Sequence, residues 1–246
     1  MSGLCEWLHE QLETLPLVRW PFNLAKLPNN GIYFFYEAGE VWGHGGSAAR
    51  IVRVGTHRDG NFRARIAEHF LIDERKMNFD ARKPAPHDRS IFRKNLGRAL
   101  LSRDTDAYAG VWEIDFMKRA NREPFAHLRD IPKEKQIESA VTRLLRETFS
   151  FRFVELNEQI RRIGRQGLEG PIIGTLAQCG ACAPSVGWLG RHSPVADIKR
   201  SGLWLVHHLK DRPLDDLAKR ELAEAISRTR ELLDRMADPQ CPRTGA

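Results

Sequence analysis

The sequence predicts an α+β protein in which helices flank a small antiparallel sheet. Two short β-rich runs, Gly31–Tyr36 and Arg50–Gly55, are joined by a glycine-rich loop, as in a hairpin. A third run, Phe149–Leu156, alternates apolar and polar residues as a half-buried strand does. Leucines recur at helical spacing near both ends of the chain, over 4–15 and 214–237. These patterns predict a hairpin and a further strand between two helical additions.

The segments between these runs are predicted to be mainly helical. Helices are predicted at 62–71, at 91–102, where the sequence is basic, and at 133–148, directly before the last strand. Residues 72–90 are charged and contain prolines, which predicts a mobile surface loop. Residues 107–116 form an aromatic stretch that leans towards β structure.

The length of 246 residues favours one large domain with additions over two full domains. We expect an N-terminal helical extension at 1–27 and a core at 28–178 with an insertion at about 71–132. Residues 179–246 are expected to form an irregular segment and a C-terminal helix that packs on the core. Within the core, 157–178 is predicted to be helical, although three glycines interrupt it.

The charge balance suits a polyanionic partner. The formal net charge is +7 and the isoelectric point is about 9.5, and basic side chains displace counterions from phosphates. Basic proteins without nucleic-acid partners are also common. No apolar run reaches the roughly 20 residues that span a bilayer, and the N-terminus lacks the layout of a signal peptide. The four cysteines suit a reducing compartment, so a cytoplasmic location without membrane contact is expected.

Cys179 and Cys182 form a CxxC motif, which is half of a zinc-binding pattern. His192, His207 and His208 follow, but at distances that match no usual second pair of ligands. No βαβ pattern surrounds the motif, so a redox role is not indicated either. The spacing therefore favours a motif without zinc and leaves the binding of zinc open.

Four short motifs that carry polar residues follow one another along the chain: Gly31-Ile32-Tyr33, Arg53-Val54-Gly55, Arg65 with His69, and Leu168-Glu169. Arg65 and His69 lie one turn apart on a predicted helix. In this order the motifs resemble those of the GIY-YIG nuclease family, over roughly 28–70 and 149–178. The stretches SIFRKNLGRALL and RSGLWLVHHL are similar to a restriction-enzyme-like branch of that family.

The resemblance implies a three-stranded antiparallel sheet flanked by helices, and phosphodiester hydrolysis with one divalent metal, Mg²⁺ or Mn²⁺. Tyr33 would be the general base or would position the attacking water, and a phenol with a pKa near ~10 needs help for this at neutral pH. Arg65 would stabilise charge on the phosphate, His69 would deliver or relay a proton, and Glu169 would hold the metal. Each residue also has a structural alternative, as a core aromatic, a packed histidine or a solvated charge.

The chain departs from the family pattern at two places. Arg53 stands where the second motif normally begins with tyrosine. Either Arg53 binds phosphate, or the nearby His57 takes over proton handling, or the enzyme is impaired. The family's asparagine beyond the metal-binding glutamate has no clear counterpart, and the segment at 204–208 offers His207 and His208 instead.

The expected function is a metal-dependent DNA endonuclease, with RNA not excluded as substrate. The alternatives are a catalytically impaired nucleic-acid-binding module on the same scaffold and an assembly protein whose terminal helices bury a partner. A homodimer is a further expectation, because a chain with one active site must either dimerise to cut both DNA strands or cut them one after the other. Basic side chains that are expected to contact the DNA backbone, with a solvated surface as the alternative, are Arg63, Arg89, Arg93, Lys94 and Arg98.

Overall fold

The structure is a computed structural model that describes residues 2–56, 60–156 and 167–237. Its sheet has the strand order β1-β4-β2-β3, and every neighbouring pair is antiparallel. The strands are β1 (Val18–Arg19), β2 (Gly31–Val41), β3 (Ala49–Gly55) and β4 (Phe149–Glu155). The predicted α+β class and the three predicted strands are confirmed. The predicted number of three is wrong, because β1 adds a fourth strand whose two residues are too few for a periodic pattern.

The central strand β2 is buried on both faces. Ile32 and Phe34 belong to one hydrophobic core, whereas Tyr33 and Phe35 belong to a second core on the opposite face. Successive side chains of a strand point to opposite faces. A strand covered on both sides therefore has a continuous apolar run, and this explains the sequence GIYFFY.

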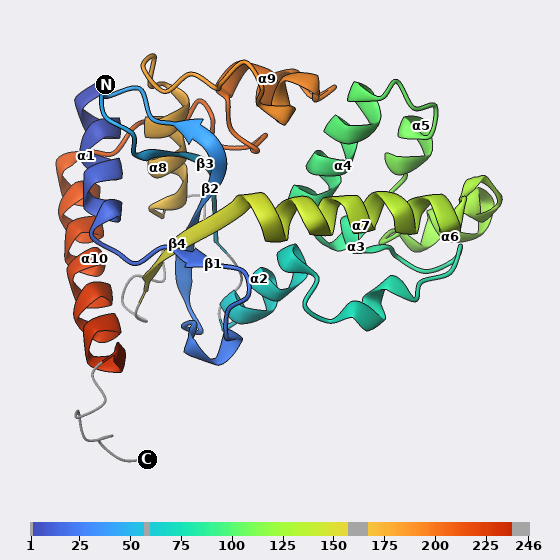
Figure 1. The fold of residues 1–246 in the computed structure, drawn as a ribbon, viewed down its shortest axis with the longest axis horizontal. Coiled ribbons are helices and arrows are strands. Elements are labelled where there is room, and N and C mark those ends of the chain that lie inside the picture. Colours follow the sequence, from blue (N-terminus) through green and yellow to red (C-terminus); the bar gives the residue numbers. More distant parts are fainter. Residues whose placement is uncertain (1, 57–59, 157–166, 238–246) are drawn as a thin grey trace.

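Three helices cover the first face of the sheet, namely α1 (Ser2–Glu13), α8 (Glu169–Ala177) and α10 (Asp216–Ala237). Figure 1 shows α1 and α10 side by side at one end of the molecule. Leu8 of α1 and Ile226 of α10 are buried in this core. The two terminal helices that the leucine spacing predicts are confirmed, and both pack on the core.

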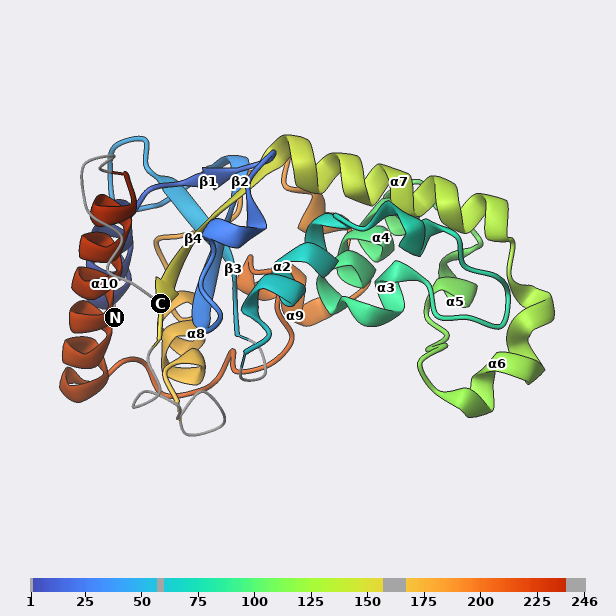
Figure 2. The ribbon, with the colours of Figure 1, turned by 90° about the horizontal axis from the view of Figure 1, so that it is seen from below.

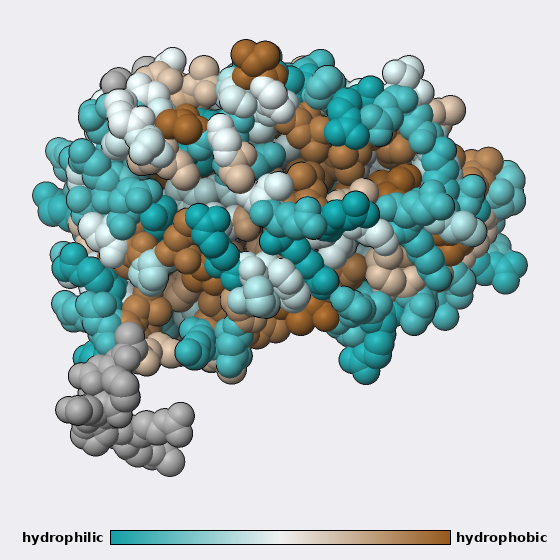
Figure 3. All heavy atoms as spheres, viewed as in Figure 1, coloured by the Kyte–Doolittle hydropathy of each residue, from teal (hydrophilic) through white to brown (hydrophobic). Residues whose placement is uncertain are grey.

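The second face packs against α2 (Phe62–Phe70), α4 (Ile91–Arg103) and α7 (Ile131–Thr148), which lie on the other side of the sheet in Figures 1 and 2. Helix α7 is amphipathic, with Val141 and Leu145 fully buried. Hydrophilic side chains form a band across the middle of Figure 3, where α7 runs in the same view of the ribbon. The helices predicted at 62–71, 91–102 and 133–148 are confirmed.

The insertion between α2 and α7 is helical. Its short elements are η2 (Glu74–Met77), α3 (Pro86–Arg89), α5 (Ala109–Trp112), α6 (Arg119–Phe125) and η3 (Ala126–Leu128). Two of these elements lie in the segment that was predicted to be a loop, at 72–90. The β-leaning prediction at 107–116 is wrong, because this segment forms α5 and turns. Its aromatic Trp112 fills space against Gly97 of α4, where a Cβ would lie 2.3 Å from the indole.

Further short helices lie outside the insertion, and they are η1 (Leu24–Lys26), η5 (Leu189–His192) and α9 (Ala196–Ser201). The last two interrupt the segment that was predicted to be irregular. The helix predicted at 157–178 is confirmed from Glu169 to Ala177, and 157–166 lie outside the described residues. In the described part of the chain, no helix is long and apolar enough to cross a membrane. The expected domain boundaries at 28 and 178 stay a prediction.

Candidate active site

Tyr33 is the third residue of β2 and lies directly opposite Gly55 of β3. The side chain is 1% exposed. A Cβ at position 55 would lie 2.2 Å from the Tyr33 hydroxyl, which is closer than atoms can pack. The absence of a side chain at Gly55 therefore leaves the space that the phenol of Tyr33 occupies across the hairpin. This is a physical reason for a glycine at the end of the RVG motif.

His69 of α2 lies behind Tyr33. Its Nε2 is 3.0 Å from the Tyr33 hydroxyl, and its Nδ1 is 2.8 Å from Oγ of Ser90. Burial lowers the pKa of His69 well below its usual value of 6.5, and the nearby Arg65, Arg53 and Arg93 lower it further. The imidazole is therefore neutral at pH 7, with one ring nitrogen able to donate and the other to accept.

Arg65 lies one turn before His69 on α2 and reaches solvent, with 25% of its side chain exposed. Its Nη1 donates to the backbone carbonyl of Arg89 at 2.9 Å and to Glu68 Oε2 at 3.2 Å. These two bonds hold one edge of the guanidinium. Because a guanidinium has five N–H donors, donors remain for a further anion.

Glu169 is the first residue of α8 and is half-buried. Thr56, which follows β3 directly, donates its hydroxyl to Glu169 Oε2 at 2.6 Å. The N-terminus of a helix favours a negative charge, because the peptide dipoles align along its axis. In residues 2–56, 60–156 and 167–237, no Lys or Arg forms an ion pair with this carboxylate.

These side chains meet at one cavity of about 160 Å³. It lies between β2, β3, α2, α4, α8 and the segment after α9. The polar or charged residues that line it are Tyr33, Arg53, Thr56, Arg65, Asn95, Glu169, His207 and His208. The structure thus brings together Tyr33, Arg65 and Glu169, which lie far apart in the sequence. His69 does not line the cavity itself but contacts the hydroxyl of Tyr33, which does.

Arg53 lines the cavity although it is only 5% exposed. Its Nη1 donates to the backbone carbonyl of Trp204 at 2.5 Å, and its guanidinium lies 4.7 Å from the centre of the Phe92 ring. Burial lowers the pKa of Arg53, while the neighbouring Tyr33 and Glu169 raise it. Its Nε is buried without a hydrogen-bond partner among the described residues. His57, the other predicted substitute for the family tyrosine, lies outside the described residues.

Three residues of the cavity wall were missed or only partly expected. Thr56 was not predicted, although it directly follows the RVG motif. Asn95 of α4 was not predicted either, and its Nδ2 is buried without a partner in the part of the chain that the structure describes. His208, which was noted in the sequence, has a φ of 64° and a contact of 2.7 Å between its Nδ1 and Asp211 Oδ2. No local pattern distinguishes such an asparagine or threonine from an ordinary polar residue.

The predicted DNA-binding set needs correction. Arg93 is fully buried, and Glu138 holds it through two contacts to Oε2, at 2.9 and 2.5 Å. Lys94 is 7% exposed and donates to the carbonyl of Glu113 at 2.8 Å. A buried cation that already has a partner is not available to a phosphate, so neither residue can contact a DNA backbone.

Arg98 is 15% exposed, and two of its nitrogens contact the Glu113 carboxylate at 2.5 Å. This pairing leaves Arg98 little free charge for DNA. Arg63 is half-buried and donates to the carbonyl of Leu27 at 2.6 Å, whereas Arg89 is exposed. Because the Arg89 carbonyl also bonds to Arg65, Arg89 lies beside the cavity.

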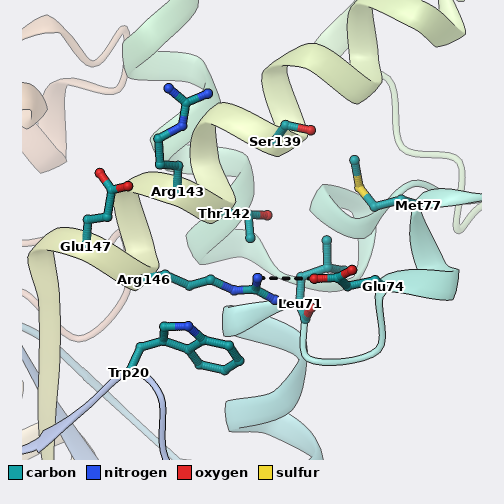
Figure 4. A pocket seen from close by; sticks show the side chains of 9 residues that line it. All are labelled: Trp20, Leu71, Glu74, Met77, Ser139, Thr142, Arg143, Arg146 and Glu147. Carbon is teal, nitrogen blue, oxygen red and sulfur yellow. Dashed lines mark hydrogen bonds and ion pairs between the residues drawn. The ribbon is translucent and has the colours of Figure 1, made fainter.

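A larger cavity of about 660 Å³ lies between α7, the segment at 71–77 and Trp20 (Figure 4). None of the predicted site residues within 2–56, 60–156 and 167–237 lines it. Its Arg146 stacks on Trp20, with 4.2 Å between the guanidinium carbon and the ring centre, and contacts Glu74 at 3.2 Å. Figure 4 shows this stack and ion pair on one wall. The volume of a cavity therefore does not by itself identify the candidate active site.

A protein-family profile described as the GIY-YIG domain matches residues 8–232. The chain belongs to the GIY-YIG family. Membership confirms the resemblance carried by the four motifs, and the match includes the second half of α1 and most of α10. GIY-YIG domains are in general endonucleases that act on nucleic acid with a divalent metal, so membership supports nuclease activity in general. Comparisons with curated proteins and with solved structures return no match.

Proposed function

We propose that this GIY-YIG protein is a metal-dependent endonuclease that hydrolyses DNA phosphodiester bonds at the cavity beside Tyr33. One observation carries the proposal: a hydroxyl from β2, the guanidinium of Arg65 and the carboxylate of Glu169 line the same cavity of about 160 Å³. These groups can respectively position a water, stabilise an anionic transition state and bind a hard cation.

The donors at the cavity fit Mg²⁺ or Mn²⁺. Glu169 offers a carboxylate without a cationic partner among the described residues, and Thr56 orients it through its hydroxyl. Oxygen donors suit these ions, which also keep several waters and take oxygens from the substrate. When bound, the ion supplies Lewis-acid stabilisation of the phosphate charge. Glu169 would hold it, and Thr56 would keep that carboxylate in place.

Arg65 would stabilise the negative charge that builds on the phosphate during hydrolysis. Its Nη1 is bonded to Glu68 and to the Arg89 carbonyl, and this orients the guanidinium plane. A fixed cation costs little reorganisation when charge develops, and this makes such a group effective. Arg53, in the place of the family tyrosine, would add a second positive charge at the cavity wall.

Tyr33 would position the attacking water. With the Nδ1 hydrogen of His69 donated to Ser90, Nε2 accepts the Tyr33 hydrogen and leaves the phenol oxygen free to accept from water. His69 is fully buried and its pKa is well below 6.5 because of that burial. It would therefore act through Tyr33 as a neutral acceptor, and we assign it as a positioning residue.

DNA would approach from the exposed side of Arg65. Arg89 and Arg63 are the predicted contacts that stay available, because Arg93, Lys94 and Arg98 are buried or paired. The same chemistry could act on RNA, since the cavity groups address the phosphate. A homodimer, which would present one cavity to each strand, belongs to the same proposal and is testable by light scattering with DNA.

The test is cleavage of supercoiled plasmid by the full chain, with Mg²⁺, Mn²⁺ or EDTA. We expect nicking with either metal, none with EDTA, and none by Glu169→Ala or Tyr33→Phe. Glu231→Ala, an exposed glutamate on α10, is the matched control and should cleave like the wild type. Equal nicking by the wild type and Glu169→Ala would remove Glu169 from the mechanism.

A second function is favoured by one observation, the buried Arg53 in place of the family tyrosine. The chain would then bind nucleic acid without cutting it. Salt-sensitive DNA binding that needs no metal, together with absence of cleavage under any divalent ion, would support this function over the first.

A further inference from the structure

Cys179 and Cys182 of the CxxC motif lie beside two residues from distant parts of the chain. Cys5 of α1 and His44 of the loop between β2 and β3 complete the group, and the four possible ligand atoms all lie within 4.8 Å of one another. The sequence favoured a motif without zinc because no second pair of ligands follows it. The second pair consists instead of residues that precede the motif by at least 135 positions. Rules based on the spacing of nearby ligands do not detect such distant residues.

Two of the distances within this group match the edges of a tetrahedral metal site. Cys5 Sγ and Cys182 Sγ are 3.8 Å apart, and Cys179 Sγ is 3.5 Å from His44 Nε2. With Zn–S near 2.3 Å and Zn–N near 2.0–2.1 Å, the edges of a tetrahedron are about 3.8 Å for S···S and about 3.6 Å for S···N. The three cysteines are free, and a disulfide would need its sulfurs near 2.05 Å.

The surroundings of the group are those of a built site. The backbone N–H of Gly43 donates to Cys182 Sγ at 3.5 Å, as an N–H group does to a metal-bound thiolate. A Cβ at Gly43 would lie 1.7 Å from the Ala181 carbonyl oxygen, so only glycine permits this close approach of the two loops. Trp42 packs against His44, with ring centres 5.5 Å apart.

The neighbouring His9 is not a ligand. Its Nδ1 lies 2.8 Å from the Cys5 carbonyl oxygen and its Nε2 lies 3.2 Å from the backbone nitrogen of Ile51. A ring with Nδ1–H donating and Nε2 accepting satisfies both contacts, and no lone pair is left for a metal. The backbone thus holds His9 beside the cluster, whereas His44 turns its Nε2 towards Cys179.

We propose that Cys5, His44, Cys179 and Cys182 bind one Zn²⁺ as a closed structural site. Three thiolates and one imidazole in tetrahedral array select zinc over the hard cations that suit Glu169. Four protein ligands leave no open position, so the ion is structural rather than catalytic. It joins α1, the hairpin loop and the end of α8, and so ties the helix that begins with Glu169 to the hairpin that carries Tyr33.

The test is the metal content of the full chain purified without chelator. We expect about one zinc per chain by elemental analysis, since a closed Cys₃His site holds a single ion. Replacement by Co²⁺ should give the visible bands of a tetrahedral thiolate complex. Cys182→Ser should lose the metal, whereas Cys241→Ser, at the remaining cysteine, should keep it. His44→Cys should keep the metal and change the cobalt spectrum.

The wild-type measurements decide the question even if a cysteine variant fails to fold. A folded wild-type chain that contains no zinc and gives no cobalt–thiolate bands would overturn the proposal. Iron with inorganic sulfide, or a disulfide among these cysteines by mass spectrometry, would overturn it as well. Because Glu169→Ala should retain zinc, a failure of the nuclease proposal is distinguishable from a failure of this one.

Discussion

The two ends of helix α8 present two different kinds of site. At its first residue, Glu169 faces a cavity of about 160 Å³ lined by oxygen and nitrogen donors. Just beyond its last residue, Cys179 belongs to a group of three thiols and one imidazole within 4.8 Å of one another. The first is a cavity that is open to a ligand, whereas the second is a close group of four possible ligand atoms.

The comparison indicates that two properties distinguish a catalytic metal site from a structural one. These are the type of the ligand atoms and the free space beside them. Hard carboxylate oxygens beside a cavity suit Mg²⁺, which keeps its waters and shares phosphate oxygens. Soft thiolates that close a tetrahedron suit Zn²⁺ and exclude substrate. If both proposals hold, removal of one ion should leave the other in place, and the following variants test that separation.

The largest expected effect is at Glu169. Glu169→Gln removes the ligand charge while keeping the shape, and we expect cleavage to fall by about 10³-fold, because metal stabilisation contributes several kcal/mol to the barrier. Zinc content should not change. Plasmid nicking and elemental analysis on the same preparation check both, with Glu231→Gln as control. Loss of zinc in Glu169→Gln would mean that the two ends of α8 are one coupled site.

The next effect concerns Arg65. Arg65→Ala should lower kcat by roughly 10²-fold to 10³-fold with little change in KM, as for removal of one donor to a transition-state charge. Arg65→Lys keeps the positive charge but loses the planar, forked arrangement of N–H donors. Its kcat should therefore lie between those of Arg65→Ala and the wild type. Single-turnover cleavage of a labelled duplex measures this. A change confined to KM would make Arg65 a binding residue.

A smaller effect is expected at Thr56, which orients Glu169 through a bond of 2.6 Å. Thr56→Val keeps the shape and removes the hydroxyl, so the Mg²⁺ concentration for half-maximal cleavage should rise by roughly 10-fold to 100-fold, as for other lost partners of metal ligands. Thr56→Ser should restore the wild-type value. If Thr56→Val leaves the Mg²⁺ dependence unchanged, this bond does not orient the metal ligand.

The stability of the fold should also depend on pH through His69. Burial keeps the folded-state pKa of His69 well below 6.5, so the unfolded chain takes up the proton first as pH falls. From pH 7.5 to 5.5 the free energy of unfolding should drop by about 1.4 kcal/mol for this residue. The His69→Gln variant should lack this decrease in the free energy of unfolding. The variant His192→Gln, at an exposed histidine, should retain the decrease. Urea unfolding at both pH values measures the difference.

The smallest effect is expected at Arg89, the exposed arginine beside the cavity that we propose contacts DNA. In the Glu169→Gln background, Arg89→Ala should weaken DNA binding several-fold and lower the salt slope by about 0.9, as for one lost phosphate contact. Arg75→Ala, another exposed arginine, should leave the slope unchanged. Fluorescence anisotropy at several salt concentrations measures both. Equal slopes in Arg89→Ala and in its background would remove Arg89 from the interface.

Local patterns predicted much of this fold, because they depend on neighbours along the chain. Period-2 alternation predicted β4, and spacing of leucines predicted α1 and α10. They failed where long-range packing decides. The basic helix at 91–102 was expected to face DNA, but it lies in the core, with Arg93 buried against Glu138 of α7. Charge in a sequence does not reveal a partner that lies 45 positions away.

The sequence by itself determined the three longer strands, the two terminal helices, the helices α2, α4 and α7, and the motifs that place Tyr33, Arg65 and Glu169 on three separate elements. Only the tertiary structure decided that these three share a cavity, that Thr56 and Asn95 line it, and that Cys5 and His44 complete the CxxC group. The physical reason is that spacing along a helix or strand fixes which residues share a face. Which faces then meet depends on the packing of the whole core.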